Sequence, residues 1–400
     1  MPTQTAVSVD SLRAGLQPGS KSQQAMPTQT AVPVDSLRAG LQPGSKSQQA
    51  MPPQTAVLLG SLLPLVETTR GFADTGTTAE NVHLGSVAVV DADGNLLWSA
   101  GDPHVMTFTR SALKPFQALP FLCDDGPAHF GFGADEVALL CASHSGEPSH
   151  VATVESMLRK IGVDEQCLAC GCAVPLYYDA VGIAAPPGTA WRAVHHNCSG
   201  KHSGFLGWCR LHGVPLESYL ERDHPLQRAV RAQLADLAGL AADAMPAGLD
   251  GCSAPNYALP LSTLATLYAR LAQGGNDTQR GPQLGQLYDA MTARPDLVSG
   301  QGRSDLFYMQ AGSGDWVSKV GADAVQTIGV RSAGIGIAIK IADGATRALP
   351  VATYSVLDQL GLLAGARRAM LEHYRAPVLR NARGMPVGDI RAVFALQRHV

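Results

Sequence analysis

The chain carries a serine three residues before a lysine in the stretch Arg110-Ser111-Ala112-Leu113-Lys114-Pro115. If this stretch is helical, positions i and i+3 share a face, and the hydroxyl of Ser111 meets the amine of Lys114. A serine becomes a nucleophile only beside a group that takes its proton. Ser-x-x-Lys is the arrangement found in enzymes that form acyl intermediates, although the same spacing also occurs by chance on solvated helices. The apolar residues on both sides favour a desolvated lysine with a lowered pKa.

Strand patterns lie on both sides of this stretch, at the two ends of the chain. His83–Ser99 predicts a β-hairpin, whereas residues 111–288 are mostly helical by pattern. Strands at both ends and helices between them predict one antiparallel sheet built from both chain ends with a helical lobe, an α+β fold. The other expected elements are strands at Val66–Arg70, Gly334–Ile341, Thr346–Thr353 and Arg391–Leu396, and helices at Val151–Ile161, Ala229–Ala242, Leu261–Leu271 and Val356–Tyr374.

A second candidate nucleophile is Ser143, in the small, polar segment Cys141-Ala142-Ser143-His144-Ser145-Gly146-Glu147. Such a segment is typical of a tight loop close to a substrate, so we expect His144 and Glu147 to contact it. The competing interpretation is a turn whose hydroxyls cap a helix that starts near Ser149. Lys319 precedes the late strands in Val317-Ser318-Lys319-Val320-Gly321-Ala322, where a Lys-x-Gly strand lines the opposite wall of Ser-x-x-Lys pockets.

Composition limits the classes of partner. The 400 residues have a net charge of −3 and no run of basic residues with interleaved aromatics, so neither nucleic acid nor a membrane surface is expected. No glycine-rich nucleotide fingerprint follows a strand, which argues against an organic cofactor. Residues 1–25 and 26–50 are a direct repeat, and we interpret residues 1–56 as a disordered leader before a catalytic domain at 57–400. Eight cysteines without a secretory signal indicate a reducing, cytoplasmic location.

Two polar, glycine-containing loops each carry one cysteine, in Cys198-Ser199-Gly200-Lys201-His202 and Gly251-Cys252-Ser253-Ala254-Pro255-Asn256. Two thiolates are suitable ligands for zinc, and His202 is the usual type of third ligand. Lys201 must lose its proton to coordinate a metal. The alternative is two buried, unreactive cysteines. Cys167, Cys170 and Cys172 have metal-like spacing, but no fourth ligand of the same style lies nearby.

Together these motifs resemble the rhizobial-type L-asparaginase II family. The resemblance runs from about Leu65 to near the C-terminus, and its ordered segments are Val66–Gly71, Phe108–Gln117, Ala142–Glu147, Asn197–His202, Asp250–Asn256, Lys319–Ala322 and Ile337–Gly344. It implies a fold like that of serine β-lactamases and penicillin-binding enzymes, a homodimer, and hydrolysis of L-asparagine to L-aspartate and ammonia.

The resemblance also implies roles for individual residues. It pairs Ser111 with Lys114 and Ser143 with Lys319, and either serine is a candidate nucleophile, with Ser111 favoured slightly for its local base. Arg110 and Asp250 are expected to hold the charged α-groups of asparagine. Zinc is expected on two cysteines and a lysine, which are Cys198, Lys201 and Cys252. The alternatives are a related glutaminase, a β-lactamase-like amidohydrolase, or a non-catalytic protein that binds zinc or an amino acid.

Overall fold

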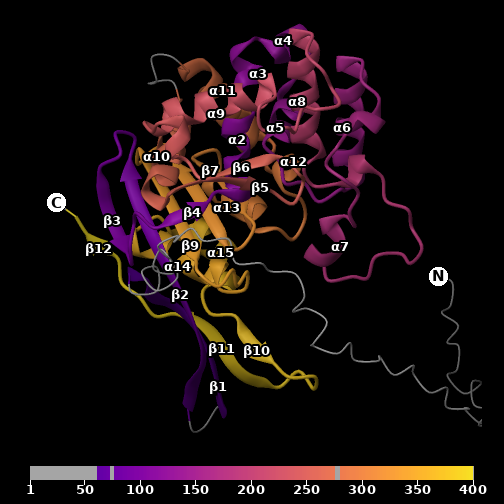
Figure 1. The fold of residues 1–400 in the computed structure, drawn as a ribbon. Helices are drawn as coiled ribbons and strands as arrows, with labels where there is room; N and C mark the ends of the chain where they lie inside the picture. Colours follow the sequence, from indigo (N-terminus) through magenta and orange to yellow (C-terminus); the bar gives the residue numbers. More distant parts are fainter. Residues whose placement is uncertain (1–60, 73–75, 275–279, 400) are drawn as a thin grey trace, which may run out of the picture. The chain divides into compact units, whose positions relative to one another are not determined.

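The computed structural model describes residues 61–72, 76–274 and 280–399. The leader expected over residues 1–56 lies outside the described residues. The described chain combines one large antiparallel sheet with a lobe of helices (Figure 1). None of the helices in this described part of the chain has the length and apolar character needed to cross a bilayer.

The large sheet is built from both ends of the chain, as expected. Its strand order is β10-β11-β1-β2-β9-β8-β7, and β3 pairs with β2 and β12. Every pairing is antiparallel, and β2 beside β9 joins the N-terminal strands to the C-terminal ones. The α+β class is therefore confirmed. The strands are β1 (Leu63–Phe72), β2 (Gly76–Asp91), β3 (Leu96–Ala100), β7 (Trp316–Gly321), β8 (Val325–Val330), β9 (Ile335–Ile341), β10 (Val378–Arg380), β11 (Pro386–Ala392) and β12 (Gln397–Arg398).

The central strands are covered on both faces. In β2, Val87 and Val89 point into a core shared with α14 (Leu349–Gln359), whereas Ala88 and Val90 point into the core of the helical lobe. This alternation follows from the two-residue period of a strand. Helix α10 (Leu261–Ala272) packs on the second face against β2, β8 and β9.

The helical lobe fills the middle of the sequence, as its pattern predicts. A small sheet lies at its base, with the order β4 (Met106–Phe108), β6 (Pro255–Pro260) and β5 (Ala247–Leu249). The remaining α-helices are α2 (Lys114–Gln117), α3 (Leu119–Cys123), α4 (Gly126–His129), α5 (Ala134–Leu140), α6 (Pro148–Ile161), α7 (Leu176–Ala180), α8 (Ser199–His212), α9 (Pro225–Ala238), α11 (Gly281–Ala293), α12 (Pro295–Val298), α13 (Ser304–Gly312) and α15 (Gly365–Leu371).

Three expectations near the C-terminus are wrong, and one is the strand over Arg391–Leu396, since β11 ends at Ala392 and β12 begins only at Gln397. Thr346–Thr353 is not a strand, because helix α14 begins at Leu349 with Pro350 in its first turn. A short apolar run suits a buried helix as well as a strand, and periodicity alone does not separate them. The single helix expected over Val356–Tyr374 is instead two helices, because Gly361 has a φ of 71° and ends α14.

Two glycines let helix α10 lie directly on the sheet. Gly329 of β8 and Gly336 of β9 are cross-strand partners. A Cβ at Gly336 would lie 1.9 Å from the carbonyl oxygen of Ala265, and one at Gly329 would lie 2.4 Å from that of Tyr268. Only glycine fits at this backbone-to-backbone contact, so these positions set the distance between α10 and the sheet.

Gly336→Ala is therefore expected to lower the free energy of unfolding by about 3 kcal/mol, because α10 must move away from β9. Chemical denaturation of the wild type and the variant measures this change. The matched control is Gly285→Ala on α11, where an added Cβ meets nothing within 4 Å. The free energy of unfolding of that control is expected to rise by about 0.5–1 kcal/mol, because alanine loses less backbone entropy than glycine on folding. A loss at Gly336 no larger than the effect at Gly285 would contradict the tight contact.

Candidate active site

Ser111 lies on a strained turn between a strand and a helix. Strand β4 ends at Phe108, Arg110 adopts a positive φ of 48°, and a 3₁₀ turn over Arg110–Leu113 leads into α2. A positive φ is uncommon for a residue other than glycine and needs support from its surroundings. Asn256 supplies it, because its Oδ1 accepts from the Arg110 N–H at 3.0 Å and its Nδ2 donates to the Arg110 carbonyl at 3.1 Å. The turn presents a partly exposed Ser111 at the start of the helical segment.

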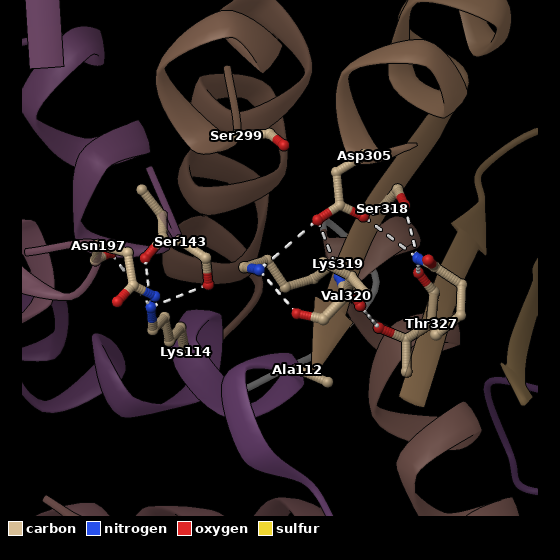
Figure 2. Close-up of polar contacts among 12 residues, drawn as sticks. Ala112, Lys114, Ser143, Asn197, Ser299, Asp305, Ser318, Lys319, Val320 and Thr327 are labelled. Atoms are coloured by element: carbon tan, nitrogen blue, oxygen red, sulfur yellow. Dashed lines mark hydrogen bonds and ion pairs between the residues drawn. The ribbon is translucent and has the colours of Figure 1, made fainter. Parts of the chain in front are cut away.

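The Lys114 amine reaches a different serine from the one expected. Its Nζ donates to Ala142 O at 2.6 Å, to Ser143 Oγ at 2.9 Å and to Asn197 O at 3.5 Å (Figure 2). Within the described residues its hydrogen bond to a serine is with Ser143 and none joins it to Ser111, and the expected Ser111–Lys114 pairing stays a prediction. The physical reason is that a buried ammonium needs several acceptors. The loop at Ala142–Ser143 and Asn197 supply three of them.

The loop that carries Ser143 is held from two sides. The Ser143 N–H donates to Val298 O at 3.0 Å, and the His144 N–H donates to Asn197 O at 3.2 Å. The Ser145 hydroxyl donates to Ser299 O at 3.0 Å. These bonds fix Ser143 in a buried position, and its hydroxyl bonds a lysine rather than capping helix α6.

His144 and Glu147 are both engaged within the protein. The Nε2–H of His144 donates to Ser199 Oγ at 2.8 Å, because that hydroxyl gives its own proton to Val194 O, and Nδ1 accepts from the Gly146 N–H. Burial lowers the pKa of His144 well below its ordinary value. Glu147 Oε1 accepts from the Gln301 N–H at 2.9 Å. Both side chains therefore hold loops together beside Ser143.

The amine of Lys319 is fully buried on β7. It donates to Val320 O at 2.8 Å and lies 3.5 Å from Asp305 Oδ2 (Figure 2). Burial is the largest influence on its pKa and, with the positive charges of Lys114 and Arg303, lowers it to about 7, although Asp305 works in the opposite direction. No hydrogen bond joins Lys319 to Ser143 in the described part of the chain, and the expected Ser143–Lys319 pairing stays a prediction. The carboxylate and carbonyl beside Lys319 are better acceptors for a buried amine than one hydroxyl.

Asp305 is a site residue that the sequence analysis missed. It is the second residue of α13, is fully buried, and accepts from Ser318 Oγ at 2.7 Å, Val320 N–H at 2.9 Å and Gln326 Nε2 at 3.2 Å. These bonds fix the carboxylate on β7 and β8, next to the Lys319 amine (Figure 2). Ser304-Asp305 after a glycine-rich stretch is a typical helix start, and this was the available signal.

Arg110 and Asp250 form an ion pair, with 2.9 Å between Nε and Oδ1. The Arg110 Nη1 also contacts the carboxylate of Asp323. Burial works to raise the pKa of Asp250, but the charges of Lys201 and Arg110 and the hydrogen bonds from Arg110 and the Gly251 N–H outweigh it and lower the pKa. Two carboxylates thus already compensate the guanidinium of Arg110.

Cys198, Lys201 and Cys252 come together as a buried group. Lys201 Nζ lies 3.2 Å from Cys252 Sγ, and a hydrogen bond with Cys252 is the largest influence that lowers the pKa of Cys198. Two thiols and an amine match the sulfur and nitrogen donors that zinc takes. No cluster of three or more His, Cys, Asp or Glu side chains suited to a metal occurs in residues 61–72, 76–274 and 280–399. His202 is turned toward Tyr219, 2.6 Å from its Nδ1 to the phenol oxygen.

The similarity of this chain to known proteins covers most of its length. A family model described as L-asparaginase II matches residues 66–392. A comparison with curated protein sequences gave no match.

Two solved structures are similar in part. One is a beta-lactamase from Mycobacterium bovis, with 16% identity, a TM-score of 0.37, and coverage of 69% of this chain and 94% of that chain. The other is a protein named Mglu in its native form, with 16% identity, a TM-score of 0.34, and coverage of 70% of this chain and 62% of that chain. Both TM-scores are low, so the fold assignment rests on the strand order and the helices themselves.

Proposed function

The chain belongs to the L-asparaginase II family, and we propose that it hydrolyses the side-chain amide of L-asparagine to L-aspartate and ammonia through an ester on a serine. The observation that carries this proposal is a serine bonded to one buried lysine, together with a second buried lysine on β7 whose pKa is lowered. Lys114 bonds Ser143 at 2.9 Å, and burial lowers the pKa of Lys319 to about 7. An amine that is partly neutral near pH 7 is suited to take a proton from a serine.

We assign the nucleophile to Ser111. It follows a strained residue between a strand and a helical segment, an arrangement that exposes a nucleophilic serine in other hydrolases. Ser111 is partly exposed, whereas Ser143 is buried and its hydroxyl already bonds Lys114. Strand β7 packs against this turn, since a Cβ at Gly321 would lie 2.8 Å from the Thr109 carbonyl oxygen. The Lys319 strand is therefore next to the Ser111 turn.

Each proton transfer has a donor and an acceptor. Ser111 Oγ bonds to the amide carbon while its proton goes to the neutral amine of Lys319. The C–N bond then breaks, and the leaving ammonia takes a proton from the Ser143 hydroxyl. The Lys114 ammonium then donates a proton to Ser143 and becomes neutral. In the second half water attacks the ester and gives its proton to Lys114, and Ser111 recovers one from Lys319. Hydrogen bonds in such sites are often longer without substrate and shorten when it binds.

Asp250 is proposed to bind the α-ammonium of the substrate. Its carboxylate is held by Arg110, so Arg110 acts as a positioning residue. Backbone N–H groups at the start of the helical segment are proposed to stabilise the oxyanion, and one such donor typically contributes about 3–4 kcal/mol.

Zinc is proposed to bind Cys198, Lys201 and Cys252. When bound it would supply a positive charge that joins the Cys198 and Cys252 loops and orients substrate. Every proton transfer above is assigned to side chains of the chain itself.

Zinc in about 100-fold excess over its Kd is expected to raise the melting temperature of the metal-free protein by several degrees, because it binds only the folded chain. Thermal unfolding measures the shift. Cys252→Ala is expected to lose it. Cys209→Ala, which removes a buried thiol of α8 outside this group, is the matched control and is expected to keep the shift. An equal shift in Cys252→Ala would refute the assigned ligands.

The proposed activity is tested by ammonia release from L-asparagine and L-glutamine and by opening of a chromogenic cephalosporin. L-asparagine is expected to have a kcat/KM about 10- to 200-fold higher than L-glutamine, which is the range for one methylene. A preference for glutamine or for the cephalosporin would replace the proposed substrate. Amino-acid binding that survives in Lys114→Met, with no ammonia released by the wild type, would indicate a non-catalytic binding protein.

The family resemblance implies a homodimer, the cysteine content without a secretory signal implies the cytoplasm, and both belong to the proposal. Light scattering of the purified full chain tests the assembly. A molar mass of one chain at micromolar concentration would contradict the dimer. Microscopy of a tagged chain in its native cell tests the location.

A further inference from the structure

The segment Ser299–Arg303 joins α12 to α13 and has no substrate-binding role in the reaction proposed above. It is nevertheless bonded to the loop of Ser143. Val298 O accepts from the Ser143 N–H at 3.0 Å, and Ser299 O accepts from the Ser145 hydroxyl at 3.0 Å. Figure 2 draws Ser299 between the Ser143–Lys114 pair and Asp305. The segment is thus a wall of the proposed active site.

Two polar groups of this segment are buried without a partner. Within the described residues, neither the Ser299 hydroxyl nor the Nη1 of Arg303 has a hydrogen-bond partner. Ser299 is fully buried. Buried polar groups in folded proteins nearly always have a partner, and leaving one without costs free energy. Two such groups on one short segment beside reactive side chains are donors open to a polar ligand.

The charges around Arg303 indicate that this ligand is an anion. Among the described residues no carboxylate lies within ion-pair distance of its guanidinium. Asp305 and Asp179 influence it only from farther away. The Asp305 oxygens are already occupied by Ser318, Val320 and Gln326. Arg110, in contrast, has two carboxylate partners.

From these observations we infer that Arg303, with the Ser299 hydroxyl, binds the α-carboxylate of the substrate. The inference rests on the proposed function and deepens it. A guanidinium matches a carboxylate through two parallel hydrogen bonds, and a serine hydroxyl adds a third donor. Arg303 also acts electrostatically on Lys319 and His144, so it is near enough to influence both sides of the site. Arg303 rather than Arg110 is therefore assigned to the α-carboxylate, and the role left to Arg110 is to position Asp250.

The test compares L-asparagine with two analogues, each lacking one charged group. β-Alaninamide keeps the ammonium and the amide but lacks the carboxylate, and succinamate keeps the carboxylate but lacks the ammonium. In the wild type, kcat/KM for asparagine is expected to exceed that for β-alaninamide by about 100-fold or more, since a site built to bond a polar group rejects an analogue without it.

Arg303→Gln is expected to reduce this ratio to about tenfold or less while leaving the asparagine-to-succinamate ratio unchanged. Arg303→Lys is expected to be intermediate, because it keeps the charge but loses the two parallel bonds. The matched control is Arg294→Gln, which removes an arginine nine residues earlier that is paired with Asp135 and Asp296. It is expected to keep both ratios. Wild-type discrimination in Arg303→Gln would overturn the inference.

Calorimetry of L-aspartate binding separates this inference from the proposed reaction. If the wild type binds L-aspartate at least tenfold more tightly than folded Arg303→Gln but releases no ammonia from asparagine, the carboxylate site stands and the proposed reaction fails. If the wild type hydrolyses asparagine and Arg303→Gln binds L-aspartate equally well, the reaction stands and the inference fails. No binding of L-aspartate to the wild type overturns the inference.

Discussion

Ser111→Ala is expected to lower kcat for L-asparagine by about 10⁴- to 10⁶-fold and to abolish the covalent intermediate. Loss of a nucleophile that works as a unit with its base costs rates of this order in other serine hydrolases. Ser143→Ala is expected to cost less, about 10²- to 10⁴-fold, because it removes one proton transfer and leaves the attacking oxygen in place. Acid quenching during turnover of a slow substrate, followed by peptide mass spectrometry, is expected to find the ester on Ser111 in the wild type and in Ser143→Ala.

Ser149→Ala is the matched control for both variants. Ser149 lies in the first turn of α6, six residues after Ser143, and is exposed. Its removal is expected to change kcat less than about twofold, as for other surface substitutions. An ester on Ser143 in the wild type would exchange the roles of the two serines. An ester on neither would remove the covalent mechanism while leaving the buried lysines unexplained.

Much of the site could be predicted because its residues come in short segments with strong local signals. The segment from Arg110 to Pro115 combines a strained turn with a helical start, and Ser111 is at that start. The two ends of the chain have the alternation of strands, and β2 pairs with β9. Local patterns therefore gave the elements and the sheet, because each depends on neighbours close in sequence.

The hydrogen-bond partners of the buried lysine amines could not be predicted in the same way. Lys114 is 29 residues from Ser143, and its choice of Ser143 over Ser111 depends on which carbonyl oxygens surround the buried amine. Asp305 was missed because its role depends on β7 and β8, which fold against α13. The helix over Leu349–Gln359 was misassigned as strand in its first half for a related reason. It is buried against the sheet, and burial removes the polar face that identifies a helix.

The pH dependence of the reaction is expected to follow Lys319. Its pKa of about 7 means that the neutral amine is the minor form below pH 7 and the major form above it. If the neutral form accepts the proton of Ser111, kcat/KM rises about tenfold per pH unit below pH 7 and reaches a plateau above it. The part of the profile that rises below pH 7 is its acidic limb. His144, the histidine next to Ser143, does not account for this limb, because burial lowers its pKa well below the ordinary value.

Lys319→Met is expected to lower kcat/KM by about 10³-fold or more and to remove the acidic limb, since no amine remains to titrate at that position. The profile is measured from pH 5 to 9 under single-turnover conditions, so that chemistry is observed rather than product release. A Lys319→Met enzyme that keeps a limb near pH 7 would show that another group accepts the proton.

Asp305→Asn also tests the assignment of Lys319 as the base, through the direction in which the acidic limb moves. The charged groups that act on Lys319 are Asp305 on α13, Lys114 on α2, Arg303 before α13 and Cys198 before α8. Asp305 is the nearby carboxylate that favours the charged amine, so its removal lowers the pKa of Lys319 further, and the acidic limb moves to lower pH. The plateau is also expected to fall, because the amine loses a neighbour that orients it. A residue with a purely structural role would lower the plateau without moving the limb. A limb that moves to higher pH in Asp305→Asn would contradict both the sign of the interaction and the assignment of Lys319 as the base.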